Sequence, residues 1–223
     1  MIYRRTENVT RRLAERREAI VAAARALAAE GGMAAVQIAP VAARAGIAAG
    51  TVYRYFPSKT ELVAAVIAAV SERELAAMHA AADAAPGPLS ALAAAVTTFA
   101  ARALHQRRLA WAVIAEPVDR EIDALRLAYR EALVAELERR LAAAVRAGHV
   151  PEQDARLTAP ALVGALIEGL IGPLAPDAPN TAAARAAVQA LTLFALRAVG
   201  IVDARARGLV VQSALPEPDE VST

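Results

Sequence analysis

The chain has 223 residues, of which 57% are hydrophobic and 22% are charged, and it contains no cysteine. This composition excludes an intrinsically disordered chain, which needs low hydrophobicity and high net charge. It also excludes a disulfide framework, a zinc site with Cys ligands and a Cys nucleophile, and it favours the reducing cytoplasm as the compartment.

The first 30 residues carry seven arginines among four glutamates, which leaves no apolar segment for an export signal. The longest uncharged run, residues 84–101, is mostly alanine and contains Pro86, Gly87 and Pro88. It is too weakly hydrophobic to hold the roughly 20 residues that a transmembrane helix needs. We therefore expect a cytoplasmic protein with no membrane partner.

The overall net charge of +2 hides a division along the chain. Residues 1–59 hold nine arginines and one lysine against four glutamates, a net charge of +6, whereas residues 60–223 carry a net charge of −4. A cationic end suggests contact with a polyanion such as nucleic acid, although an arginine-rich solvated helix gives the same count.

Apolar residues recur at spacings of three and four, without sustained alternation, so we expect an all-α protein. Gly31–Gly32, Gly46 and Gly148 are predicted helix ends, and Ser58 with Glu61 forms a predicted capping box. The predicted helices span residues 11–30, 38–45, 49–55, 58–82, 89–104, 107–115, 119–147, 158–175 and 182–199.

The last two predicted helices have almost no charged residues and are apolar on nearly every side. Such helices must be covered on more than one face, which favours a homodimer built from them; a centrally buried helix within one protomer is the alternative. The expected interface residues are Ala161, Gly164, Ala165, Glu168, Val188, Leu191 and Ala195. The tail from Leu209 is expected to fray.

Residues 38–59 predict two short helices joined by a tight turn at Gly46, which is the spacing of a helix-turn-helix. A short helix can enter the major groove when a second helix braces it, and small residues are needed where the two cross. Ala42, Ala43 and Ala49 are small enough, and Val41, Ile47 and Val52 form the expected apolar seam.

The string AARAGIAAGTVYRYFPSKTEL at residues 42–62 closely resembles the DNA-binding domain of the TetR family of transcriptional regulators. The resemblance covers roughly residues 13–65, and beyond it only length and helix count are similar. It implies a three-helix DNA-binding domain over residues 1–65, an effector-binding and dimerisation helical bundle over residues 66–208 and a tail over residues 209–223.

The resemblance also implies that Thr51, Tyr53, Tyr55 and Lys59 contact phosphates, together with Gln37 at the start of the bracing helix. Hydroxyl and ammonium groups near a helix N-terminus suit this role, because the free amides and the helix dipole already favour an anion. The aromatic rings of the two tyrosines can pack within the domain at the same time, and Phe56 is expected in its core.

Two departures from the family pattern concern DNA reading. Ala48 replaces the usual Ser or Thr, so the recognition helix loses an N-cap worth about 1 kcal/mol. Ala49 and Gly50 cannot hydrogen-bond to bases through side chains, although an alanine methyl can touch thymine. Base contacts are therefore expected from Arg44, Thr51 and Arg54, with Arg44 as the leading candidate and a phosphate or solvent role as its alternative.

An N-terminal arm, residues 1–10 with Arg4 and Arg5, precedes the first predicted helix. Arginines on such arms enter narrow minor grooves in some DNA-binding proteins. A disordered tail is the alternative.

We expect no enzyme, no cofactor and no metal site. His79, His105 and His149 are far apart in sequence, and none lies three or four residues from another. The chain also has no P-loop, GxGxxG or GxSxG motif.

For the second half, the resemblance implies a pocket for a largely apolar small molecule between the central helices. The candidate lining residues are Met78, Phe99, Arg102, Trp111, Glu116, Arg126 and Tyr129, each of which can equally be ordinary core or surface. A buried Glu116 would need a cation, either Arg126 or a basic ligand.

These features predict a repressor that binds a palindromic operator in double-stranded DNA as a homodimer and is released by a small-molecule effector. Two alternatives remain. One is a cytosolic carrier of small molecules that does not bind DNA, and the other is an interaction scaffold.

Overall fold

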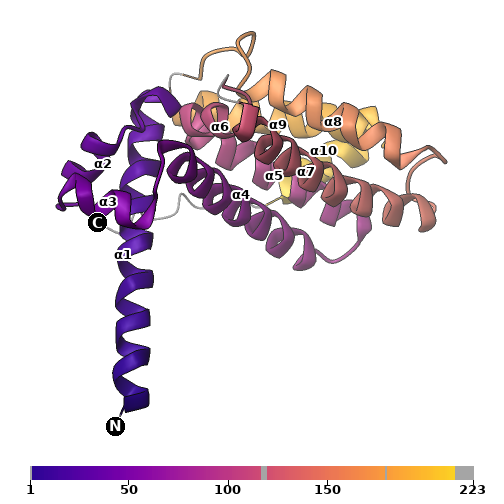
Figure 1. Ribbon diagram of the computed structural model, residues 1–223. Helices are drawn as coiled ribbons and strands as arrows, with labels where there is room; N and C mark the ends of the chain where they lie inside the picture. The colour runs from indigo at the N-terminus through magenta and orange to yellow at the C-terminus, as the bar shows by residue number, and fades with distance from the viewer. Residues whose placement is uncertain (1, 117–119, 179, 214–223) are drawn as a thin grey trace.

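The computed structural model describes residues 2–116, 120–178 and 180–213, with side chains from Val9 onward. Every regular element in these ranges is a helix, as the periodicity predicts. The N-terminal unit stands apart from the larger helical bundle (Figure 1). It consists of α1 (Ile2–Gly31), the 3-10 turn η1 (Met33–Ala35), α2 (Ile38–Arg44), α3 (Ala49–Tyr55) and the first turns of α4 (Lys59–Asp83).

The core of the N-terminal unit is apolar and small. Val41 on α2 and Val52 on α3 are fully buried, and Phe56, predicted as a core residue, is only 2% exposed. These side chains pack with Ile20 on α1 and Leu62 on α4 in one continuous core. This apolar contact stabilises the short helices α2 and α3 between α1 and α4, because helices of seven residues are not stable by propensity alone.

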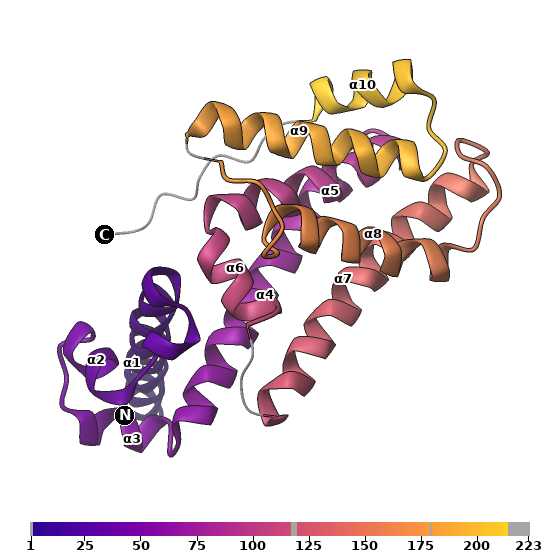
Figure 2. The same cartoon turned by 90° about the horizontal axis from the view of Figure 1, so that it is seen from above.

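In the larger bundle, α5 (Pro88–His105) is the central helix. It packs against the helices on every side, which Figure 2 shows from above. Its many alanines allow this close approach, and most of its residues are buried. The surrounding helices are α4, α6 (Arg107–Ile114), α7 (Arg120–Arg146), α8 (Ala155–Leu170), α9 (Thr181–Ala198) and α10 (Asp203–Gln212).

The two units share structure. Helix α4 is continuous from Lys59 to Asp83, so the boundary expected after residue 65 falls inside it. Helix α6 of the bundle also packs against α1. A displacement in the bundle therefore has two direct routes to the N-terminal unit.

Two predicted ends are wrong. Helix α1 begins at Ile2, so residues 2–10 of the expected arm are helical; Met1 lies outside the described residues. The tail prediction fails for residues 209–212, because α10 buries Ala206 and Leu209 three residues apart on one face. Residues 214–223 lie outside the described ranges. Within those ranges no helix has both the length and the hydropathy to cross a membrane.

Candidate DNA-binding surface and effector cavity

The turn between α2 and α3 has helix-turn-helix geometry. Gly46 adopts a φ of +64°, which favours glycine, and the Ile47 amide donates to the Ala42 carbonyl at 3.0 Å. Val41 and Val52 form the buried seam as predicted, while Ile47 is partly buried. Helix α3 is thereby held across α2 with its opposite face open.

The predicted DNA contacts lie on α3, at the two ends of α2 and at the start of α4. Tyr53 is 52% exposed, and nothing would obstruct a Cβ atom at Gly50. Thr51 and Tyr55 are half-buried, so their polar ends remain accessible. The other predicted contacts are all exposed, namely Gln37, Arg44, Ala49, Arg54 and Lys59.

The two helix starts on this surface differ in capping. Ala48 precedes α3 with no side-chain hydrogen bond, as predicted, so the first amides of α3 point outward uncapped. At the start of α4 the Ser58 hydroxyl accepts from the Glu61 amide at 3.1 Å, the predicted cap. Lys59 is thus placed at a fixed helix N-terminus, where phosphate binding is favoured.

Arg44 has a protein partner that the sequence prediction did not include. Its guanidinium donates to both carboxylate oxygens of Glu30 at 2.7 and 2.9 Å, which joins the end of α2 to the end of α1. This pair raises the pKa of Arg44 and lowers that of Glu30. The pair is exposed and such pairs contribute little to stability, so the expected base contact of Arg44 stays a prediction.

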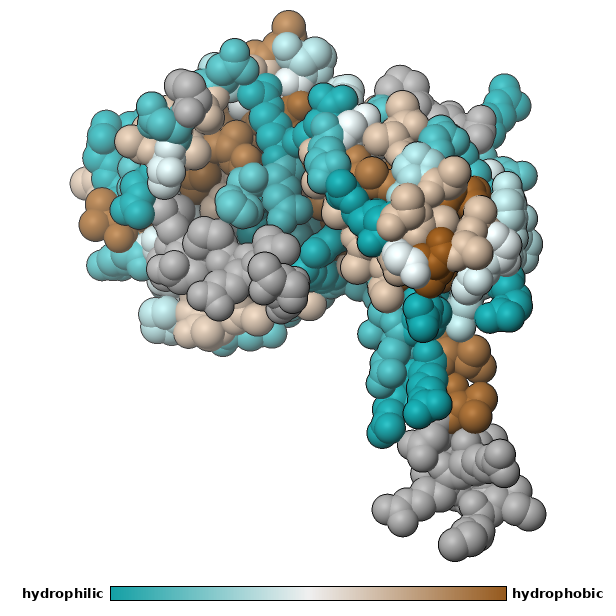
Figure 3. All heavy atoms as spheres, turned by 90° about the vertical axis from the view of Figure 1, so that its left-hand side faces the viewer, coloured by the Kyte–Doolittle hydropathy of each residue, from teal (hydrophilic) through white to brown (hydrophobic). Residues whose placement is uncertain are grey.

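The N-terminal part of α1 projects from the rest of the molecule with nothing packed around it (Figures 1 and 3). Val9 and Leu13 are about half exposed along one edge, and Arg12 and Arg16 are exposed as well. Residues 2–10 of the expected arm therefore continue α1 as a helix.

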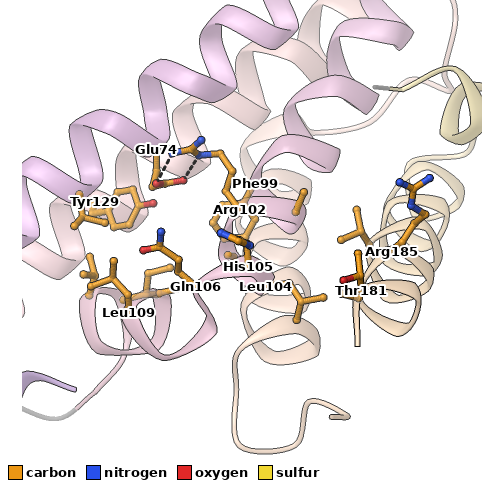
Figure 4. Close-up of a pocket in the computed structure, with 18 residues that line it drawn as sticks. Glu74, Phe99, Arg102, Leu104, His105, Gln106, Leu109, Tyr129, Thr181 and Arg185 are labelled. Carbon is orange, nitrogen blue, oxygen red and sulfur yellow. Dashed lines mark hydrogen bonds and ion pairs between the residues drawn. The ribbon is translucent and has the colours of Figure 1, made fainter. Parts of the chain in front are cut away.

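The bundle contains a cavity of about 370 Å³ between α4, α5, α6, α7 and the first turns of α9. Figure 4 shows side chains from these helices directed into it. Of the predicted lining residues, Phe99, Arg102 and Tyr129 do line it. Residues that the prediction missed include Val70, Glu74, His105, Gln106, Leu109, Val113, Arg185 and Val188.

The other four predicted residues have different places. Met78 is a core side chain, 1% exposed, and Trp111 is half-buried on α6 without lining the cavity. Arg126 is buried and donates to the Ala112 carbonyl at 2.6 Å, which ties α7 to α6. Its burial lowers its pKa despite the nearby negative charges of Asp123 and Glu116.

Arg126 also departs from the usual division of apolar and charged residues on α7. The apolar Leu125 is 37% exposed, whereas its charged neighbour Arg126 is buried. A buried guanidinium needs hydrogen-bond acceptors, and the Ala112 carbonyl supplies one. Arg126 lies four residues after Ile122 and three before Tyr129, which is the spacing of one helix face. This spacing is the signal that could have placed Arg126 on the buried face.

Glu116 connects the bundle to the N-terminal unit. Its carboxylate accepts from the Met33 amide at 3.0 Å, just after α1 ends. Gly32 has a φ of +73°, and a Cβ atom there would lie 2.6 Å from Glu116 Oε2. Glycine at position 32 therefore allows both the turn and the close approach of the carboxylate.

The cavity contains one strong ion pair. Arg102 Nε and Nη2 donate to the two Glu74 oxygens at 2.6 and 2.9 Å, which joins α5 to α4. Tyr129 lies beside this pair, 4% exposed, and burial raises its pKa far above the ordinary value. Its hydroxyl therefore remains protonated.

On α9, two of the residues expected in the dimer interface lie on the face that packs inside the protomer. Val188 and Ala195 are buried within the protomer, on the face where Thr192 hydrogen-bonds to Thr97 of α5 at 3.3 Å. The apolar face of α9 that remains accessible includes Phe194, which is 50% exposed. Of the expected residues on α8, Ala161, Gly164 and Glu168 are exposed and Ala165 is half-buried. Leu191 on α9 is also half-buried.

Comparison with known proteins decides the family. Residues 20–66 match the model for "Bacterial regulatory proteins, tetR family". The chain belongs to the TetR family. The match covers α2, α3 and the first turns of α4, which form the helix-turn-helix of a DNA-binding domain. The described residues also contain no group of three or more His, Cys, Asp or Glu side chains able to hold a metal ion.

The TetR domain is similar to those of named repressors. It is 52% identical over 59 residues to the HTH-type transcriptional repressor KstR of Rhodococcus jostii (strain RHA1), and 51% identical over 53 residues to KstR of Mycobacterium tuberculosis (strain ATCC 25618 / H37Rv). These matches cover 26% and 24% of this chain, and 28% and 24% of the relatives' own length. The likeness to KstR therefore covers about a quarter of this chain and of each relative.

Solved structures share the whole TetR architecture. RolR in complex with resorcinol superposes with a TM-score of 0.66 at 24% identity, covering 93% of this chain and 98% of RolR. FadR from Bacillus subtilis in complex with stearoyl-CoA has the same TM-score at 20% identity, covering 78% and 97%. At this identity the likeness shows the fold alone.

Proposed function

We propose that this regulator is a repressor that binds a palindromic operator as a homodimer and leaves it when a small molecule occupies the cavity. The observation that carries the proposal is the open face of α3 with Lys59 beside it, within a TetR domain. Two such faces in a dimer would enter successive major grooves about 34 Å apart.

On this surface the phosphate contacts are assigned to Gln37, Thr51, Tyr53, Tyr55 and Lys59. Thr51 and Arg54 are assigned to base edges, and Ala49 and Gly50 to close backbone approach, since neither obstructs the groove. Arg44, which is bound to Glu30 in the free protein, remains a proposed base contact.

The dimer is proposed to form through the exposed apolar faces of α8 and α9. Leu157 is 74% exposed and lies on the same face of α8 as Ala161, Gly164 and Glu168. With Phe194 on α9, these residues leave a large apolar surface that a second copy of the chain would cover.

Release is proposed to run through α6. Leu109 and Val113 of this helix line the cavity, and Glu116 just beyond its end accepts from the Met33 amide. A ligand that favours a different position of α6 would alter this bond and so the orientation of α1 and α3. The ligand can change the equilibrium between the DNA-binding and the released form only by the difference in its binding free energy to the two.

The nature of the effector is supported by the cavity and by two neighbours. The named ligands of the RolR and FadR complexes, resorcinol and stearoyl-CoA, are both organic molecules. The cavity of about 370 Å³ has the size of small-molecule sites, and most of its lining is apolar.

A gel-shift titration with the DNA upstream of the gene tests the proposal. We expect binding to an inverted repeat that weakens steeply between low and moderate salt, because phosphate contacts release counterions. Binding that does not depend on salt would contradict the phosphate assignments. No binding even at low salt would favour the carrier alternative.

A further inference from the structure

The two ends of the cavity differ in chemistry, and this difference bears on the ligand. Figure 4 shows Tyr129, Gln106 and the Glu74–Arg102 pair gathered at one end, while Thr181 and Arg185 lie across the cavity on α9. The first end is the inner end, because Tyr129 is buried. The second end is the rim, because Thr181 and Arg185 are exposed.

The inner end contains an unused hydrogen-bonding group. Within the described part of the chain, the Tyr129 hydroxyl has no hydrogen-bond partner, although the residue is only 4% exposed. Its oxygen points into the space beside Glu74 and Gln106 (Figure 4). Among the described residues the buried side-chain atom without a partner is Arg126 Nε, so the Tyr129 oxygen is not sealed in protein. It opens to the cavity, where it can bond to a ligand oxygen.

The charges of the lining do not cancel. Glu74 and Arg102 neutralise each other through two hydrogen bonds, which leaves neither as a net charge for a ligand. Arg185 is exposed and has no acidic partner among the described residues. Arg185 therefore leaves a positive charge at the rim, which favours an anionic group there.

The walls between these ends are apolar. Val70, Phe99, Leu109, Val113, Ile114 and Val188 contribute most of that surface. A ligand that satisfies the whole lining must therefore have an apolar body, a polar oxygen at one end and a negative charge at the other.

We propose that the effector is an amphipathic organic acid, with a hydroxyl or carbonyl oxygen bound to Tyr129 beside Gln106 and an anionic oxygen group bound to Arg185. The apolar body lies against the α5 and α6 walls. This proposal rests on the proposed function, because it names the ligand class of the same cavity.

The test uses isothermal titration calorimetry of the full chain with matched probes in octyl, dodecyl and hexadecyl series. Each series contains the ω-hydroxy acid, the simple fatty acid, the diol and the alkyl phosphate. We expect the ω-hydroxy acid of the best-fitting length to bind about fivefold more tightly than the acid and than the diol, one hydrogen bond or one charge contact being lost in each. Comparing the alkyl phosphate with the fatty acid shows whether the anionic group that binds is a phosphate or a carboxylate.

Two variants assign the contacts. Tyr129→Phe should remove the advantage of the ω-hydroxy acid over the simple acid, and Arg185→Gln should remove its advantage over the diol. Arg130→Gln is the matched control for charge, because Arg130 is exposed on α7 away from the cavity, and it should change neither ratio. Both test positions tolerate the change without loss of fold, one being a conservative swap and the other exposed.

The outcomes separate this inference from the proposed function. Diols that bind as well as acids in every series, or affinity ratios unchanged in both variants, would overturn the inference even if operator binding is normal. Acids that bind as expected but do not release operator DNA would support the ligand class and contradict the release mechanism.

Discussion

The two units of the molecule differ in where they keep their polar groups. Among the described residues, the buried polar and charged side chains all lie in the bundle, on α4, α5, α7 and α9, and none lies in α1, α2 or α3. The N-terminal unit has an apolar core and carries its functional groups outside. The bundle buries Arg126, Glu136 and Arg140, which is costly unless each is paired.

This difference shows how each unit meets its partner. DNA is large and charged, so a small rigid unit needs only an exposed surface, and its core can be purely hydrophobic. A small molecule must be enclosed, so the bundle has to bring polar groups inside and hold them in place. Variants in each unit test this difference in the placement of polar groups.

The largest effect is expected in the apolar core. Phe56→Ala should lower the free energy of unfolding by about 4 kcal/mol, because it empties a fully packed site between α1, α3 and α4. Urea denaturation measures the loss. A loss below about 1 kcal/mol would show that the N-terminal unit does not depend on this core.

The corresponding test in the bundle is Glu136→Gln. This carboxylate is buried, accepts from Arg140 Nε at 2.7 Å and lies 3.2 Å from His79. Without its charge the buried Arg140 keeps only the exposed Asp83 as an acidic partner among the described residues, and we expect about 3 kcal/mol of destabilisation. Exposed Glu131→Gln is the control and should stay within about 0.5 kcal/mol. Equal effects of the two substitutions would contradict a buried network.

The link between the units is tested by two glycines. Gly32→Ala should cost about 2 kcal/mol, because the methyl group adds a clash with Glu116 to the strain of a positive φ. Gly46→Ala has the same strain with open space around it and should cost about 1 kcal/mol. Thermal unfolding compares them. If the two costs are equal, the close approach of Glu116 has no energetic role.

Smaller effects are expected on the DNA surface. Tyr53→Phe should weaken operator binding about fivefold, by about 1 kcal/mol, while stability is unchanged. Lys59→Ala should weaken binding to all sequences and lower the salt slope by about one. Fluorescence anisotropy measures both. Tyr129→Phe, inside the bundle, is the control and should not affect DNA binding in the absence of ligand.

The smallest effect concerns pH, and one exposed carboxylate with an arginine partner is compared in each unit. Arg140 holds the pKa of Asp83 below its ordinary value, and Arg44 does the same for Glu30. A lowered folded-state pKa stabilises above the unfolded pKa, and the stabilisation is lost as pH falls through the folded value. Asp83→Asn and Glu30→Gln should therefore destabilise slightly at about pH 7 and not at about pH 2. A difference that grows toward acid would contradict these directions.

The sequence predicted the N-terminal unit better than the bundle, for a physical reason. Helix α3 was predicted at its observed bounds and the Ser58 cap was confirmed, because turns and caps depend on neighbouring residues. Glu74, His105 and Arg185 were missed because they come from three helices whose approach no local spacing encodes. The interface phase on α9 was wrong because alanine makes every face of that helix look apolar, and the Thr97–Thr192 contact decides it.

The most direct test of the central claim, that two α3 faces read one operator, is DNase footprinting of the full chain on the DNA upstream of its gene. We expect two protected half-sites about one helical turn apart. Protection should be lost in Tyr53→Phe/Lys59→Ala and kept in the Arg130→Gln control. A single unpaired footprint, or equal protection by the double variant, would contradict the account.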